Sequence, residues 1–174
     1  FEYIYFARLD SKIDNISVYE ARIRGGATLA KTYPVDADLV CGVPDSGLAS
    51  AKGYSEESGI PFGLAFHKNS YVGRTFIKPT QKERESSVKI KLSVLESVVK
   101  GKRIVLVDDS IVRGTTISNL ITMLRKAGAT EVHVRISSPP FLYPCYFGTD
   151  VPSNKQLIAS SHSTEEIRQQ IGAD

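Results

Sequence analysis

Apolar and polar positions along the chain form two kinds of pattern, short apolar runs and longer segments with helical spacing. Leu39–Val43 and Ile104–Val107 are apolar runs bounded by turn residues or carboxylates, which predicts buried strands. Residues 132–136 alternate between apolar and polar side chains, which predicts a strand with one more exposed face. Residues 60–66 are interpreted as a further strand.

Helical signals lie between these runs, at about residues 17–33, 48–58, 117–127 and from 163 onward. Ser17 with Glu20 and Ser163 with Glu166 have the spacing of capping boxes, in which Ser opens a helix and Glu follows three residues later. Gly25–Gly26 weakens the first helical segment. Because strands and helices alternate, the chain is predicted to be an α/β protein with a mostly parallel central sheet flanked by helices.

The stretch over residues 69–85 is different, because it is polar, contains Gly73 and Pro79, and has no clean period. It predicts a long loop. Long loops inside compact domains are often lids over functional sites.

Composition narrows the class of protein. The chain has 174 residues, of which 41% are hydrophobic and 24% charged, as expected for one soluble domain. The net charge of +3 suits a small anionic ligand but is too weak to indicate nucleic-acid binding. No apolar run has the length of a membrane span and the start lacks a signal peptide, so we expect no membrane partner and a cytoplasmic location.

The two ends predict that residues 1–174 form one domain of a longer polypeptide. Phe1 starts directly in an apolar, aromatic run without an initiator Met, and Asp174 comes just after a helical pattern. The two cysteines form no disulfide framework.

The segment from residue 104 to 116 carries the clearest chemistry. Four apolar residues end at Asp108 and Asp109, followed by a loop rich in hydroxyl groups and glycine and then by a helix. Ligands of open α/β sheets bind at the carboxyl ends of the strands, and backbone N–H groups at a helix start attract phosphate. A lone Asp pair would more simply end a strand. The whole string, however, predicts a sugar-phosphate site with the two carboxylates at its rim, near sugar hydroxyls or a hydrated Mg²⁺.

A second turn, Pro44–Gly47, follows the strand at 39–43 and faces the same edge of the sheet. Taken alone, its residues are those of an ordinary turn.

Four strings occur in an order that resembles the family of glutamine 5-phosphoribosyl-1-pyrophosphate (PRPP) amidotransferases, at residues 42–47, 68–77, 107–116 and 137–140. The third string is similar to the PRPP-binding signature of type I phosphoribosyltransferases, and residues 71–77 are the part that points to the narrower family. The resemblance spans essentially the whole chain. It implies a type I phosphoribosyltransferase fold with a flexible loop over the site.

The resemblance also implies site residues. The turn after the first buried strand would hold pyrophosphate through Pro44, Asp45, Ser46 and Gly47. Mg²⁺ would be bound by Ser46, Asp108 and Asp109, and the two aspartates would hold the ribose hydroxyls. The 5-phosphate loop would consist of Ser110, Ile111, Val112, Arg113, Gly114, Thr115 and Thr116. The flexible loop would place Lys68 and Arg74 on anionic oxygens and Tyr71 on an ammonia path.

The reaction implied by the resemblance is displacement of pyrophosphate from PRPP by ammonia, which gives 5-phosphoribosylamine, the first step of de novo purine biosynthesis. Family members release that ammonia from glutamine in a separate glutaminase domain with an amino-terminal Cys nucleophile. Residue 1 is Phe and no segment resembles that domain, so this chain is expected to be ammonia-dependent at most. A full-length protein is expected to form a homo-oligomer.

Cys145 matches one ligand position of the [4Fe–4S] cluster found in some family members. One cysteine cannot hold a cluster that needs four thiolates, so a cluster is expected only in a longer chain. Cys41 lies in a predicted buried strand and is expected to be inert.

Three other interpretations stay open on the sequence alone. The acceptor could be a nucleobase, although no segment is assignable to a base-binding hood. The domain could be a PRPP-sensing regulator without turnover, although the modest charge and the absence of a helix-turn-helix pattern disfavour it. The abrupt ends also fit a remnant that folds without activity.

Overall fold

The computed structural model describes residues 1–69, 92–145, 151, 153 and 156–174. The predicted loop at 69–85 therefore lies, from residue 70 onward, outside the described residues.

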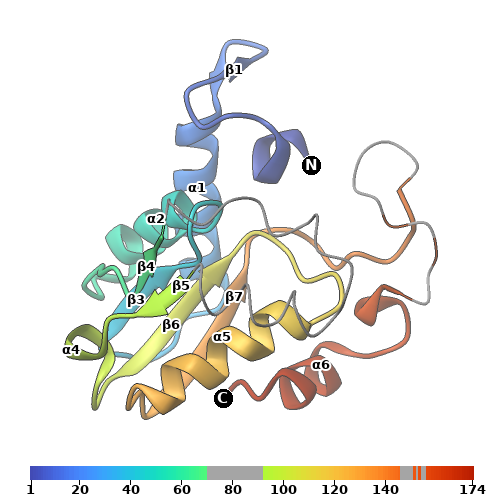
Figure 1. Cartoon of the computed structure of the whole chain (residues 1–174). Helices are drawn as coiled ribbons and strands as arrows, with labels where there is room; N and C mark the ends of the chain where they lie inside the picture. Colours follow the sequence, from blue (N-terminus) through green and yellow to red (C-terminus); the bar gives the residue numbers. More distant parts are fainter. Residues whose placement is uncertain (70–91, 146–150, 152, 154–155) are drawn as a thin grey trace.

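A parallel sheet of three strands, in the order β3-β6-β7, forms the centre of the molecule (Figure 1). β6 (Arg103–Asp108) pairs on one side with β3 (Leu39–Gly42) and on the other with β7 (Glu131–Ile136). The pairing is parallel on both sides, which confirms the predicted α/β fold with helices as crossovers. All three strands lie within the runs that the apolar pattern indicated or extend them by one or two residues.

Within the described residues, four helices lie close to their predicted positions before, between and after these strands. They are α1 (Val18–Thr32), α2 (Leu48–Ser58), α5 (Thr115–Lys126) and α6 (Thr164–Ile171), with a short α4 (Glu96–Val99). The smaller elements are η1 (Glu2–Phe6), β1 (Lys12–Ile13), β2 (Ile16–Ser17), β4 (Phe66–Lys68), β5 (Leu92–Val94) and η4 (Ile158–Ser160). The Ser17 hydroxyl caps α1 by accepting the Glu20 N–H, and Ser163 with Glu166 forms the full capping box of α6.

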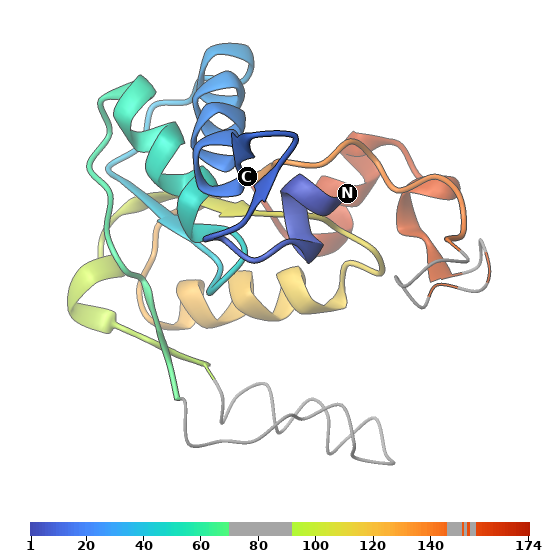
Figure 2. The same ribbon diagram turned by 90° about the horizontal axis from the view of Figure 1, so that it is seen from above.

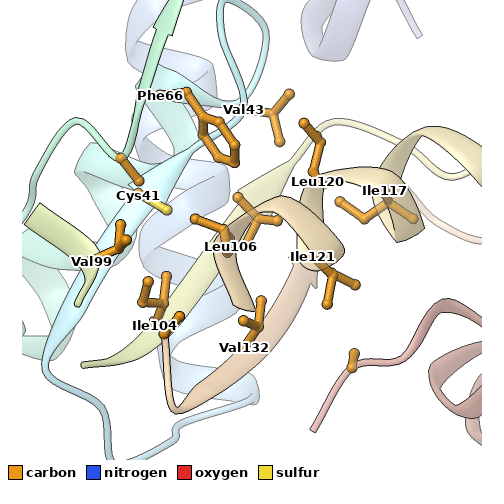
Figure 3. Packing of buried hydrophobic residues seen from close by; sticks show 14 of the residues in the cluster. Cys41, Val43, Phe66, Val99, Ile104, Leu106, Ile117, Leu120, Ile121 and Val132 are labelled. Atoms are coloured by element: carbon orange, nitrogen blue, oxygen red, sulfur yellow. The ribbon is translucent and has the colours of Figure 1, made fainter. Parts of the chain in front are cut away.

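Helices cover both faces of the sheet, and β6 contributes to the core on each side. α1 and α2 lie on one face and α5 on the other, as the turned view makes plain (Figure 2). Ile104 and Leu106 pack towards α5, where they meet Ile117 and Ile121 (Figure 3). Val105 and Val107 pack with Tyr54 of α2 on the opposite face. Each buried aliphatic side chain contributes about 1.5–3 kcal/mol, so β6 is the most strongly anchored strand.

α1 and α2 touch through glycines. A Cβ atom added at Gly26 would lie 1.8 Å from the Ser50 carbonyl oxygen, and one added at Gly53 would lie 2.0 Å from the Ile23 carbonyl oxygen. Since no such contact is sterically possible, the close approach of the two helices requires these glycines. Gly25, next in sequence, has nothing within 4 Å of its would-be Cβ.

The strand predicted at residues 60–66 is wrong over most of its length. Only Phe62 forms an isolated parallel bridge, with Val40, and β4 begins at Phe66. Pro61 explains the interruption in part, because it lacks the N–H that a ladder needs and offers only its carbonyl, which accepts the Val40 N–H at 2.9 Å. β4 instead pairs antiparallel with β5, a strand that the sequence pattern does not indicate.

Candidate functional site

The carboxyl ends of the three parallel strands are fixed to one another by backbone hydrogen bonds. The Val43 N–H donates to the Val107 carbonyl at 2.9 Å, which holds the first turn against β6. The Ser137 and Ser138 N–H groups donate to the carbonyls of Asp108 and Asp109, at 3.0 and 2.9 Å. The predicted turn, the acidic pair and the segment after β7 therefore meet at one edge of the sheet, where ligands of such folds bind.

Asp108 and Asp109 are more enclosed than the rim position predicted for them. Their exposed fractions are 8% and 6%, because the segments after β3 and β7 flank them. The Asp109 N–H donates to the Asp108 carboxylate at 2.9 Å, and the Ser110 hydroxyl donates to the Asp109 carboxylate. The acidic pair is thus oriented by its own backbone and by the first residue of the following loop.

The pKa of Asp108 is raised to about 7, mainly by burial and to a smaller extent by the charge of Asp109. Hydrogen bonds from the Asp109 N–H and from the Ser46 hydroxyl favour the charged form and partly offset the burial. Ser46 therefore reaches Asp108, so two of the residues proposed to bind metal are brought together.

The Pro44–Gly47 turn also reaches β4. The peptide bond between Pro44 and Asp45 is cis. The Lys68 ammonium, at the end of β4, forms an ion pair with the Asp45 carboxylate. This pair places the charge of Lys68 beside the turn that the resemblance assigns to pyrophosphate.

The loop between β6 and α5 has the geometry of an anion site. Gly114 adopts a φ of +80°, a left-handed conformation that glycine adopts without strain, and α5 begins at the next residue, Thr115. Thr115 and Thr116 are exposed, and Ser110 is partly exposed. The first N–H groups of an α-helix have no intrahelical acceptor and carry the positive end of the helix dipole, so this loop can bind a phosphate group.

Other predicted residues are separate from this cluster or outside the described residues. Tyr71 and Arg74 lie in the undescribed part, so their roles stay predictions. Cys145 forms an isolated bridge with Val151, and its role as a cluster ligand is likewise untested. Cys41 is fully buried in β3, and burial raises the pKa of its thiol to about 12, which keeps it protonated and unreactive.

Arg22 of α1 is a residue beside the site that the sequence reasoning missed. It is buried, and its guanidinium donates to the carbonyls of Tyr3, Tyr5 and Ala7 at 2.7, 3.2 and 2.9 Å. Burial lowers the pKa of Arg22, and the charge of Asp109 partly offsets this decrease. Its signal was present in the sequence, because it occupies a buried helical face together with Val18, Gly26 and Ala30.

The described residues contain neither a ready-made metal cluster nor a membrane span. Within those ranges, no three His, Cys, Asp or Glu side chains gather into a group that could hold a metal by themselves. Nor does any helix in the described parts have the length and apolar character needed to cross a membrane.

The sequence matches known proteins on two levels. The model of the phosphoribosyl transferase domain family matches residues 14–137, which include the turn, the acidic pair and the phosphate loop. The amidophosphoribosyltransferase of Bacillus subtilis is 60% identical over 173 residues, and that of Methanocaldococcus jannaschii is 59% identical over 174. The matches cover 99% and 100% of this chain but only 36% and 37% of the two relatives.

A solved structure leads to the same family. The glutamine PRPP amidotransferase from B. subtilis, complexed with ADP and GMP, has a TM-score of 0.89 and 60% identity over 99% of this chain and 38% of that one. The chain thus spans a little over a third of the length of the relatives it matches. It belongs to the phosphoribosyl transferase domain family, and over its whole length it is similar to the corresponding part of amidophosphoribosyltransferases.

Proposed function

We propose that this chain is the PRPP-binding domain of an amidophosphoribosyltransferase, where pyrophosphate is displaced from ribose C1 by ammonia to give 5-phosphoribosylamine. The observation that carries the proposal is the convergence of three features at one sheet edge. A buried acidic pair lies between a loop built for phosphate and a turn that carries Ser46 and the Lys68–Asp45 pair. PRPP has a matching order of groups, a 5-phosphate, a ribose and a pyrophosphate.

The 5-phosphate would bind the loop formed by residues 110–116. The N–H groups at the start of α5 and the hydroxyls of Ser110, Thr115 and Thr116 are donors suited to phosphate oxygens. Gly114 allows the backbone to approach the ligand, because it has no side chain. Asp108 and Asp109 would then accept hydrogen bonds from the ribose hydroxyls.

The acidic pair also fits Mg²⁺. Two adjacent buried carboxylates, with a pKa of about 7 for Asp108, are stabilised in their charged form by a divalent cation. Mg²⁺ is usually held by one or two carboxylates together with substrate phosphates, so this small donor set with Ser46 suits it. When bound, Mg²⁺ would neutralise charge on the pyrophosphate oxygens.

The displacement needs charge neutralisation more than base catalysis. The lone pair of ammonia forms the C1–N bond, the C1–O bond to pyrophosphate breaks, and the new ammonium loses a proton. Ammonia is already a nucleophile, so the residues of the chain chiefly orient ribose and bind the leaving group. The ion pair of Lys68 with Asp45 in the pyrophosphate turn supports the second task for Lys68. In a longer parent chain, a glutaminase domain would supply the ammonia.

The test is release of pyrophosphate from PRPP with ammonium salts and Mg²⁺. We expect release to require both, and Asp109→Ala to lower kcat/KM at least about tenfold, which corresponds to roughly 1.4 kcal/mol of transition-state stabilisation. Asp36→Ala is the matched control. Asp36 pairs with Arg103 at the opposite end of β6, so its removal should leave the rate within about twofold, the scale expected of surface substitutions.

Unchanged rates in both Asp108→Ala and Asp109→Ala would contradict the assignment. Turnover with nucleobases but none with ammonia would instead indicate a nucleobase phosphoribosyltransferase.

A further inference from the structure

The segment from Gln156 to Ile171 lies outside the residues matched by the phosphoribosyl transferase domain family, yet it contacts the phosphate loop. The Ile158 N–H donates to the carbonyl of Val112 at 2.9 Å. The Arg113 guanidinium donates to the side-chain oxygen of Gln156. Two consecutive loop residues are therefore tied to this segment by hydrogen bonds.

Apolar packing adds to these bonds at the end of the loop. A Cβ atom on Gly114 would lie 3.1 Å from the Ile158 Cδ1 atom and 3.4 Å from the Ile171 Cγ2 atom. Ile158 and Ile171 are both buried, with exposed fractions of 7% and 5%. The glycine that opens α5 thus lies close to two isoleucines of the later segment, and a side chain at this position would press against them.

The far end of the segment is fixed as well. α6 starts at the Ser163 capping box and ends at Gly172, whose carbonyl accepts a hydrogen bond from Arg125 of α5 at 2.9 Å. Figure 1 shows α6 beside α5, and η4 contacts α6. The segment is therefore held to α5 at one end and supports the loop at the other.

We propose that Ile158 is a positioning residue for the phosphate loop, and that Gln156–Ile171 braces this loop in its ligand-binding conformation. The inference rests on the proposed function, in which residues 110–116 bind the 5-phosphate. A loop that must aim several N–H groups at one phosphate loses conformational freedom when it binds, and a brace that fixes it beforehand removes part of that cost. The described contacts of the brace reach the 5-phosphate loop, so it should affect that end of PRPP selectively.

Calorimetric titration with ribose 5-phosphate and, separately, with pyrophosphate and Mg²⁺ tests this selectivity. We expect Ile158→Ala to raise the Kd for ribose 5-phosphate about tenfold, equivalent to ~1.4 kcal/mol, while the Kd for pyrophosphate changes less than about twofold. Ile158→Leu, which keeps a terminal Cδ methyl group for the contact with Gly114, should restore most of the affinity. Ile121→Ala is the matched control, because Ile121 is equally buried in α5 but faces the core under the sheet. It should lower Tm without changing the Kd for ribose 5-phosphate.

Gln156→Ala provides a second route if Ile158→Ala does not fold, because the Arg113–Gln156 bond is on the surface. We expect it to raise the Kd for ribose 5-phosphate about threefold, the scale of one surface hydrogen bond. Wild-type affinity for ribose 5-phosphate in both variants, or an equal loss for pyrophosphate, would overturn the brace. A wild-type chain that binds neither ligand would refute the proposed function itself.

Discussion

Replacing Gly26 with alanine is expected to lower the free energy of unfolding by at least about 3 kcal/mol, the upper range for overpacked sites. The new methyl group would lie 1.8 Å from the Ser50 carbonyl oxygen, so α1 and α2 must move apart. A carbonyl of a neighbouring helix cannot rotate away as a flexible side chain can, which is why the cost should be large. Urea or thermal unfolding followed by circular dichroism measures the change.

Gly25→Ala is the control for this prediction, since it makes the same substitution one residue earlier in the same helix. Its methyl group meets nothing within 4 Å, and alanine favours the helical conformation. We expect a gain of about 0.5–1 kcal/mol, the usual difference between the two residues inside a helix. Equal effects at the two positions would mean that the helices are not held at this distance.

Replacing Asp108 with asparagine is expected to stabilise the protein and to abolish most of its proposed activity. The folded-state pKa of about 7 is above the ordinary value of 3.8, so the native protein binds more protons than the unfolded chain between these limits. The contribution of Asp108 to the free energy of unfolding is therefore fully present below about pH 4 and is lost as the pH rises towards 7. Asparagine does not ionise and escapes this loss, which amounts to roughly 4 kcal/mol at most.

Thermal unfolding from pH 4 to pH 8.5 without Mg²⁺ tests the prediction. The Asp108→Asn substitution should raise Tm most at high pH, and the difference should shrink as the pH falls. Ammonia-dependent pyrophosphate release should fall at least about tenfold, because the side chain can no longer offer two charged oxygens to ribose or metal. A lower Tm for this variant at pH 8 would contradict the prediction, because it would show that burying the charged carboxylate does not destabilise the protein.

The sequence predicted the elements that have a strong period or a strong signal at their ends. α6 is a clear case, since Ser163 and Glu166 cap it as expected, and β6 begins and ends close to its apolar run. The strand at residues 60–66 was predicted wrongly because their apolar composition suits a strand, whereas Pro61 permits only part of the hydrogen-bond ladder. β5 was missed because it forms through its pairing with β4, and no periodic pattern of apolar residues in its own sequence indicates that pairing.

The candidate site was predictable only where one string of residues makes it. Asp108 to Thr116 form a continuous segment, so the sequence alone predicts the kind of ligand that they bind. The contacts of Ile158 with the loop, and of Arg22 with the first residues of the chain, join segments far apart in the sequence. Such neighbours follow from folding alone. Ile158 carries no unusual local signal, whereas Arg22 is a charged residue on a helical face that is otherwise apolar.

The position of β6 between two strands and two helical layers bears on how the molecule moves. A strand paired on both edges and covered on both faces opens only when most of the domain unfolds, so its amide hydrogens should exchange last. The acidic pair is attached to this slowest part of the chain. The turn at Pro44–Gly47 follows β3, which pairs with one edge of β6, and Lys68 is the last residue of β4 in a separate two-stranded sheet. We therefore expect the proposed ligand to bind against the part of the domain that opens least.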